Sequence, residues 1–107
     1  MGCSYFVSTH FNSCGDTGSE SYIHSLNAAF GSSLLQLILH SKLIEGLGLC
    51  DRSKQEGQFE VCGGKVPAIL LEICFFDNTS VVATYQARKQ YFAECLVAGL
   101  YEYTSTL

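Results

Sequence analysis

The sequence predicts one α/β domain over residues 1–107, with a mixed, mostly parallel sheet flanked by helices in three layers. The segments follow the order strand, strand, helix, strand, strand, helix, which is typical of α/β folds. A continuous apolar run over 66–78 is typical of a strand buried on both faces. The chain of 107 residues suits one compact domain, and its 48% hydrophobic and 15% charged residues exclude a disordered chain.

The first segments are short and extended. Residues 4–9 are aromatic and β-branched in part and predict a strand, and the glycine-bearing stretch 14–18 predicts a loop. Residues 19–25 predict a second strand, whose alternation places Glu20 on one face and Ser21 on the other.

The middle of the chain holds one amphipathic helix. Apolar residues at i, i+3 and i+4 predict a helix over 32–47, with an apolar stripe broad enough to be covered on more than one side. His40 lies within this helix, and we expect it at the polar margin. Residues 51–57 are the most charged stretch and predict an exposed loop or a short turn of helix, followed by a brief strand over 58–62.

The last third begins with the buried strand and ends in helices. Asn78 is an N-cap residue for a short helix, and residues 87–103 predict the final helix. The run over 66–78 contains one carboxylate, Glu72. Because Glu is almost never buried without a partner, Glu72 needs a cation, a hydrogen-bond network or a proton. The alternative is a structural Glu72 that accepts backbone N–H bonds from a neighbouring loop.

His10 ends the first predicted strand, and Glu72 lies toward the end of the buried strand. If these two strands are neighbours, an imidazole and a carboxylate meet at one edge of the sheet. That pair suits a metal-bound water, with His10 as ligand and Glu72 as general base. A catalytic zinc takes three protein ligands, and spacing alone offers only His10. We expect His24 to be a hydrogen-bonded edge residue.

Composition restricts the partners and the compartment. A net charge of −4 without a basic cluster argues against nucleic-acid binding, and no apolar stretch reaches the ~18 residues of a membrane span. The six cysteines are scattered without a C-x-x-C pair, and Cys74 and Cys95 fall inside predicted core segments. Scattered buried thiols favour a reduced compartment over a disulfide framework. The N-terminus lacks the pattern of a signal peptide, so we expect synthesis in the cytoplasm without one.

Four stretches resemble motifs of the zinc-dependent N-acetylmuramoyl-L-alanine amidases, cell-wall hydrolases of bacteria and phage endolysins. Residues 6–13 are similar to Ser-aliphatic-His-x-Asn-Ala/Ser, and residues 18–22 to Gly-x-Glu-x-Tyr. Residues 51–52 resemble an Arg-containing turn. Residues 67–78 resemble Pro-Ala-aliphatic-Leu-aliphatic-Glu-aliphatic-Gly-Phe-x-Ser-Asn, with Cys74 in place of the glycine.

The resemblance implies roles for four residues. His10 matches a zinc ligand and Glu72 the catalytic carboxylate, while Asn12 and Arg52 match positions that we expect to bind substrate. The implied reaction is hydrolysis of the amide between N-acetylmuramic acid and the L-alanine of the stem peptide in peptidoglycan, with zinc as cofactor. The site of action would be the bacterial cell wall.

The resemblance also implies missing parts. In the family, a Gly-His-Gly motif in the first strand and a Glu in the following helix supply the other two zinc ligands, and neither is found in this sequence. We therefore expect a C-terminal part of the catalytic domain, metal-poor and inactive unless another polypeptide completes it. A sheet without that strand exposes an edge, so we also expect self-association. The rival interpretations are a noncatalytic muropeptide-binding or regulatory fragment, and an unrelated α/β domain.

Overall fold

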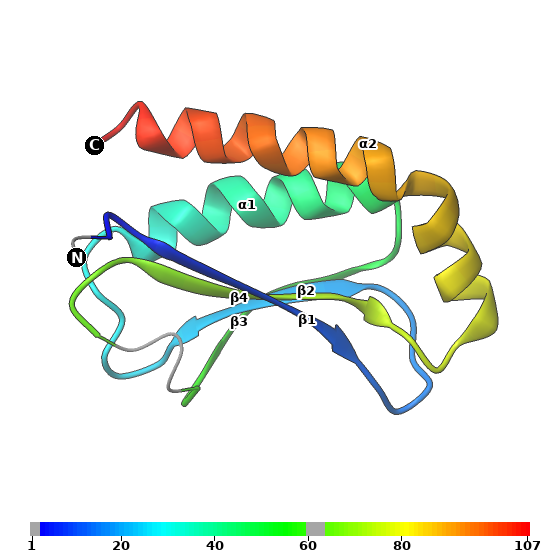
Figure 1. Cartoon of the computed structure of the whole chain (residues 1–107). Helices are drawn as coiled ribbons and strands as arrows, with labels where there is room; N and C mark the ends of the chain where they lie inside the picture. The colour runs from blue at the N-terminus through cyan, green and yellow to red at the C-terminus, as the bar shows by residue number, and fades with distance from the viewer. Residues whose placement is uncertain (1–2, 60–63) are drawn as a thin grey trace.

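The computed structural model describes residues 3–59 and 64–107, which form the elements in the expected order (Figure 1). The strands are β1 (Phe6–Asn12), β2 (Ser19–His24), β3 (Asp51–Gly57) and β4 (Ala68–Phe75). The helices are α1 (Ser32–Leu47) and α2 (Thr79–Thr104).

The strands form one sheet in the order β1-β4-β2-β3. β1 pairs in parallel with β4, and β2 pairs in parallel with β3, whereas β2 and β4 run antiparallel. The predicted mixed, mostly parallel sheet is confirmed. β4 lies in its interior and is buried along its length except at Glu72, which explains its continuous apolar sequence.

Both helices lie on the same side of the sheet, where α1 covers the strands and α2 packs on α1 (Figure 1). One stripe of α1 packs with alternate residues of β4 to form the main core, together with residues of α2. The core residues from α1 and β4 include Leu35, Leu39, Leu43, Leu47, Ile69, Leu71 and Ile73. No helix of the described residues covers the opposite side, which we call the helix-free face.

The two helices approach closely where each carries a glycine. A Cβ atom at Gly46 would lie 2.7 Å from the Cα atom of Phe92, and one at Gly99 would lie 2.8 Å from Cγ of Lys42. Both distances are too short for a real side chain. These glycines therefore allow α2 to lie directly on α1, which explains why α1 is buried on two sides.

The helix ends follow the capping residues. α1 ends at Gly48, whose left-handed conformation (φ 67°) lets its N–H bond the carbonyl of Ile44. α2 starts at the predicted cap, since the Asn78 side chain accepts hydrogen bonds from the backbone N–H groups of Ser80 and Val81. The short and final helices expected over 78–103 are one continuous helix.

Two strand predictions were wrong. Residues 51–57 are not a loop but the edge strand β3, because β2 supplies a parallel partner and an edge strand tolerates charged side chains. The strand expected over 58–62 falls partly outside the described residues, and Gln58 and Phe59 are not in a strand. β1 is also shifted along the chain relative to the expected 4–9, because it pairs with β4 as far as Asn12.

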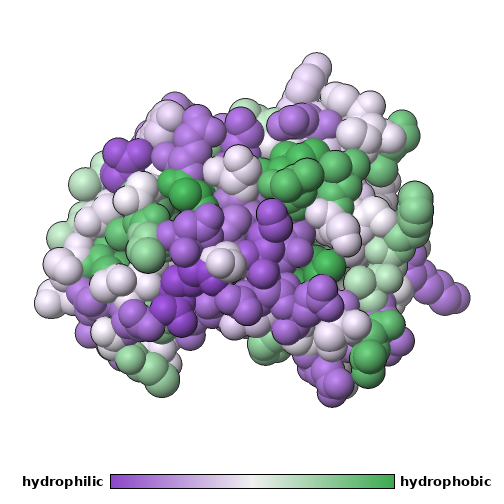
Figure 2. All heavy atoms as spheres, turned by 180° about the vertical axis from the view of Figure 1, so that it is seen from behind, coloured by the Kyte–Doolittle hydropathy of each residue, from purple (hydrophilic) through white to green (hydrophobic). Residues whose placement is uncertain are grey.

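The surface combines hydrophilic and hydrophobic areas. Seen from behind (Figure 2), a hydrophilic band crosses the molecule and the hydrophobic atoms gather in separate patches around it. Leu34 and Leu37 of α1 are among the exposed hydrophobic residues. Among the described helices, none combines the length and the hydropathy that crossing a bilayer requires.

Candidate active site

Three ionisable side chains occupy one line across the sheet. His10 of β1 is the register partner of Glu72 in β4, and Glu72 is also the partner of Glu20 in β2. Register partners in neighbouring strands point to the same face. The imidazole and the carboxylate that the sequence analysis paired are therefore neighbours. They share a face with the hydrogen-bond partners of Glu20.

Glu72 is partly enclosed, and its Oε2 atom is buried without a hydrogen-bond partner among the described residues. Burial raises the pKa of its carboxyl above the ordinary value, the charge of His10 lowers that pKa, and the charge of Glu20 raises it again. Glu72 therefore takes up a proton more readily than an exposed carboxylate. His10 itself is exposed, and its Nε2 lies 3.0 Å from Oγ of Ser8.

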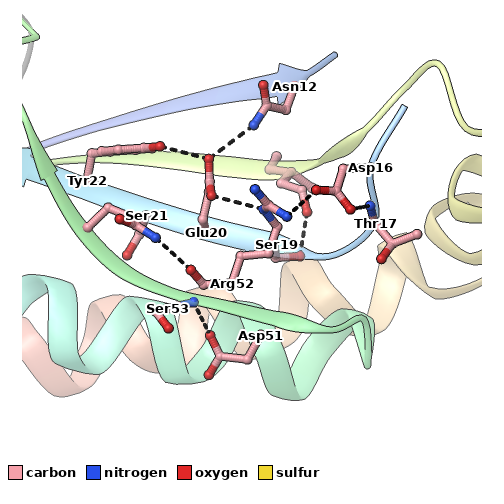
Figure 3. Close-up of polar contacts among 12 residues, drawn as sticks. Asn12, Asp16, Thr17, Ser19, Glu20, Ser21, Tyr22, Asp51, Arg52 and Ser53 are labelled. Carbon is pink, nitrogen blue, oxygen red and sulfur yellow. Dashed lines mark hydrogen bonds and ion pairs between the residues drawn. The ribbon is translucent and has the colours of Figure 1, made fainter. Parts of the chain in front are cut away.

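Glu20 is buried and bonded at both carboxylate oxygens (Figure 3). Its Oε2 accepts hydrogen bonds from Nδ2 of Asn12 at 3.1 Å and from the hydroxyl of Tyr22 at 2.8 Å. Its Oε1 accepts a bond from Nε of Arg52 at 3.1 Å. Burial, together with the bond to Glu20, raises the pKa of Tyr22 to about 12, so this phenol stays a donor.

Arg52 is held between two carboxylates. Its Nη1 donates to Oδ2 of Asp16 at 2.5 Å while its Nε donates to Glu20, and its guanidinium lies 5.1 Å from the ring centre of Phe75. We call Asp16, Arg52, Glu20, Asn12 and Tyr22 the Glu20 network. Asn12 and Arg52 are thus engaged within the chain, and their expected role in substrate binding stays a prediction.

The loop between β1 and β2 is fixed by Asp77, the second residue after β4. Both carboxylate oxygens of Asp77 accept bonds from the backbone N–H of Gly15, at 3.1 and 3.0 Å, and Oδ2 also accepts the N–H of Cys14 at 2.9 Å. Cys14 and Gly15 both have positive φ angles, 89° and 68°. Successive N–H groups in such a turn form a concave anion site, which the Asp77 side chain occupies here.

The first two residues of the stretch 18–22 each have a structural role. Gly18 has φ 99°, and a Cβ atom there would lie 2.3 Å from the carbonyl oxygen of Cys50, so only glycine allows β2 to start beside β3. Ser19 donates from Oγ to the carbonyl of Ile73 at 2.6 Å. Sequence reasoning missed Glu20, although its alternation with Tyr22 within this motif was a signal.

A Ser-His-Asp chain of hydrogen bonds lies under α1. Oγ of Ser21 is 2.7 Å from Nδ1 of His40, and Nε2 of His40 is 2.8 Å from Oδ1 of Asp51. His40 is buried, so its expected place at the polar margin was wrong; the buried Ser21 hydroxyl offers it a partner. Because Ser21 is fully enclosed, no substrate reaches it. The two hydrogen bonds of His40 instead hold α1 to β2 and β3. His24 accepts the N–H groups of Leu26 and Asn27, so it is hydrogen-bonded as expected, but it ends β2, which is an interior strand and not an edge strand.

The described residues fit a zinc ion only in part. His10 offers one imidazole beside an acid with an unpartnered oxygen, which suits one ligand and one base. Residues 3–59 and 64–107 bring no group of three His, Cys, Asp or Glu side chains together that could hold a metal. A zinc ion here would require ligands from elsewhere.

Solved structures place this fold among cell-wall amidases. The chain superimposes on the catalytic domain of CwlV, an N-acetylmuramoyl-L-alanine amidase from Bacillus (Paenibacillus) polymyxa var. colistinus, with a TM-score of 0.83 and 28% identity. An N-acetylmuramoyl-L-alanine amidase from Clostridium difficile 630 gives a TM-score of 0.84 and 28% identity. Each comparison covers 95% of this chain and 58% of the other.

The sequence comparison then gives the family. Residues 1–102 match the family described as N-acetylmuramoyl-L-alanine amidase, and the chain belongs to it. The sporulation-specific N-acetylmuramoyl-L-alanine amidase of Bacillus subtilis (strain 168) is 36% identical over 80 residues. That alignment covers 74% of this chain and 31% of the relative, so the chain spans about a third of the curated relative's length.

Proposed function

We propose that this chain provides the catalytic carboxylate and one zinc ligand of an amidase that hydrolyses peptidoglycan between N-acetylmuramic acid and L-alanine. The observation that carries the proposal is the pairing of His10 with Glu72 across β1 and β4, on a face that no described helix covers. Family membership and fold support the same reaction class.

Glu72 is suited to the role of general base. Among the described residues, its buried Oε2 has no partner that would hold the carboxylate ionised, and its pKa is raised mainly by burial. A base with such a pKa takes the proton of an attacking water and returns it to the leaving amine more easily than an exposed carboxylate. The leaving amine in this reaction is that of L-alanine.

The zinc ion, when bound, lowers the pKa of water and polarises the substrate carbonyl. His10 would hold it through one imidazole nitrogen, and Glu72 stands at the neighbouring register position to exchange the proton. We propose that the remaining ligands come from a segment that resembles the family's first strand and helix. Without it the chain should bind zinc weakly and leave cell walls intact.

The test is complementation. The part of the sporulation amidase of Bacillus subtilis that precedes its matched region is supplied with this chain, as a fusion or in trans. We expect one zinc per complex and release of L-alanine amino termini from purified peptidoglycan. His10→Ala should remove both zinc and activity, whereas Glu72→Gln should retain zinc and lose activity.

The chain also offers a matched control variant, and the same experiment can distinguish hydrolysis from noncatalytic binding. Glu56→Gln removes the same charge from an exposed position of β3 and should change neither measurement. Hydrolysis by the Glu72→Gln complex would contradict the proposal. Zinc-free complexes that bind peptidoglycan without cleaving it would instead support the noncatalytic muropeptide-binding fragment.

A further inference from the structure

The end of β1 has little backbone support. β1 pairs on one side only within the described residues, and its register with β4 is interrupted between His10 and Asn12. Beyond that interruption, the Phe76 N–H donates to the carbonyl oxygen of Asn12 at 3.0 Å. Strand ends with few hydrogen bonds open readily, and His10 lies immediately before this end.

A side-chain contact anchors the same end from across the sheet. The Asn12 carboxamide accepts the Ser13 N–H at its Oδ1, at 3.0 Å, and directs its Nδ2 to Glu20. Because β4 lies between β1 and β2, this bond (Figure 3) joins two strands that are not neighbours. It lies on the face that carries Glu72, the register partner of Glu20.

The anchor is itself held in place. Glu20 is 5% exposed and accepts bonds from Arg52 and Tyr22, while Arg52 is held by Asp16 in the loop that Asp77 fixes. Hydrogen bonds to a charged acceptor are about twice as strong as neutral ones, so a buried carboxylate is a firm attachment point for an amide.

We propose that Glu20 is a positioning residue of the amidase site: through Asn12 it keeps the end of β1 closed and His10 opposite Glu72. The benefit of this role to catalysis rests on the proposed function. The effect of Glu20 on the end of β1 can be measured without substrate or metal. Arg52, on this view, serves the site by orienting Glu20.

The test is amide hydrogen exchange of the whole chain, followed residue by residue by NMR. In Glu20→Gln and in Asn12→Ala, exchange at Phe76 should accelerate about tenfold or more relative to wild type, the loss expected for a hydrogen bond to a charged group. Exchange at Leu39 and Leu43, in the buried stripe of α1, should change much less. Glu56→Gln serves as the charge-matched control and should leave the Phe76 rate unchanged.

Two results would overturn the proposal. One is an unchanged Phe76 rate in both variants; the other is equal acceleration at Phe76 and in α1, which would mark Glu20 as a general stabiliser of the fold. If Glu20→Gln does not fold, Asn12→Ala still decides the matter, because it leaves the bonds of Glu20 to Tyr22 and Arg52 in place. If the wild-type complex does not hydrolyse peptidoglycan but exchange at Phe76 accelerates in the variants as expected, only the proposed function is contradicted.

Discussion

Glu20 and Glu72 are register partners, yet their surroundings differ in the way that separates a structural carboxylate from a reactive one. Glu20 accepts three hydrogen bonds from donors on β1, β2 and β3. Glu72 has a buried oxygen with no partner among the described residues, and its pKa is raised. A partly buried carboxyl with a raised pKa and an unpartnered oxygen is typical of acid–base sites, which supports Glu72 as the proton carrier.

Asp51 gives the fold a dependence on pH. The hydrogen bond from His40, followed by that from the Ser53 amide, holds the pKa of Asp51 below its ordinary value of 3.8. A carboxyl with a lowered folded-state pKa contributes stability above pH 3.8, and this contribution is lost as pH falls through the folded-state value. Asp51→Asn should therefore lower the free energy of unfolding at pH 7, and the difference from wild type should shrink in acid.

Urea unfolding of wild type and Asp51→Asn at several pH values between 7 and 3 measures this difference. Because the Asp51 side chain is 52% exposed, solvent screens its interaction and the effect at pH 7 should be modest. Glu102→Gln, an exposed change on α2, is the control. Equal free energies of unfolding for wild type and Asp51→Asn at pH 7 would show that the His40–Asp51 contact does not stabilise the folded state.

At the scale of elements, the contact between α1 and α2 depends on the absence of two side chains. Gly46→Ala would place a Cβ atom 2.7 Å from the backbone of Phe92, which no rotamer change relieves. We expect the free energy of unfolding to fall by about 1–3 kcal/mol, the usual cost of overpacking, although Ala favours a helix over Gly by about 1 kcal/mol.

Thermal or urea unfolding tests this expectation against Ser41→Ala, a change on the exposed side of the same helix. Ser41→Ala should alter stability by about 0.5 kcal/mol or less. Stabilisation by Gly46→Ala would mean that helix propensity outweighs the close approach, and that α2 can shift on α1 at little cost.

The elements differ in how far sequence predicted them. Helix α1 and strand β4 were foreseen because each has a strong pattern, the helical period in one and a continuous apolar run in the other. β3 was missed because an edge strand takes its stability from backbone pairing with β2, and its charged side chains carry no apolar alternation.

The candidate site shows the same division. His10 and Glu72 were paired from sequence because each is an ionisable residue near the end of a predicted strand. Glu20 and Asp77 were missed, since their importance lies in partners far along the chain: Arg52 for one and the loop at Cys14 for the other. Such contacts follow from strand order, which local patterns do not give.

At the scale of the whole molecule, β1 is an edge strand that no other described strand or helix covers on its outer side. Phe6 and Phe11 of this strand are 44% and 47% exposed, whereas the other edge, β3, is charged along its length. An edge with exposed aromatic residues and free N–H and C=O groups favours pairing with another chain. We expect concentration-dependent self-association of the chain, weakened by Phe11→Asp.

Analytical ultracentrifugation over a range of concentrations measures this association. Leu26→Asp is the control, because Leu26 is exposed but lies in the turn after β2, away from β1. A monomer at all concentrations would contradict the expectation, as would equal weakening by both variants.

The Asp77 carboxylate, which closes on the amides of Cys14 and Gly15, also governs where the chain can be cut or lengthened. Inserting a tag at residues 13–17 would separate Asp16 from Arg52 and release the framework beneath the site. The exposed turn around Leu26 is tied to a distant strand by one backbone hydrogen bond, from the Ser25 N–H to the carbonyl of Gly57 at 3.0 Å. Affinity tags should therefore be inserted, and circular permutants opened, in the turn around Leu26, because fewer tertiary contacts are lost there than at residues 13–17.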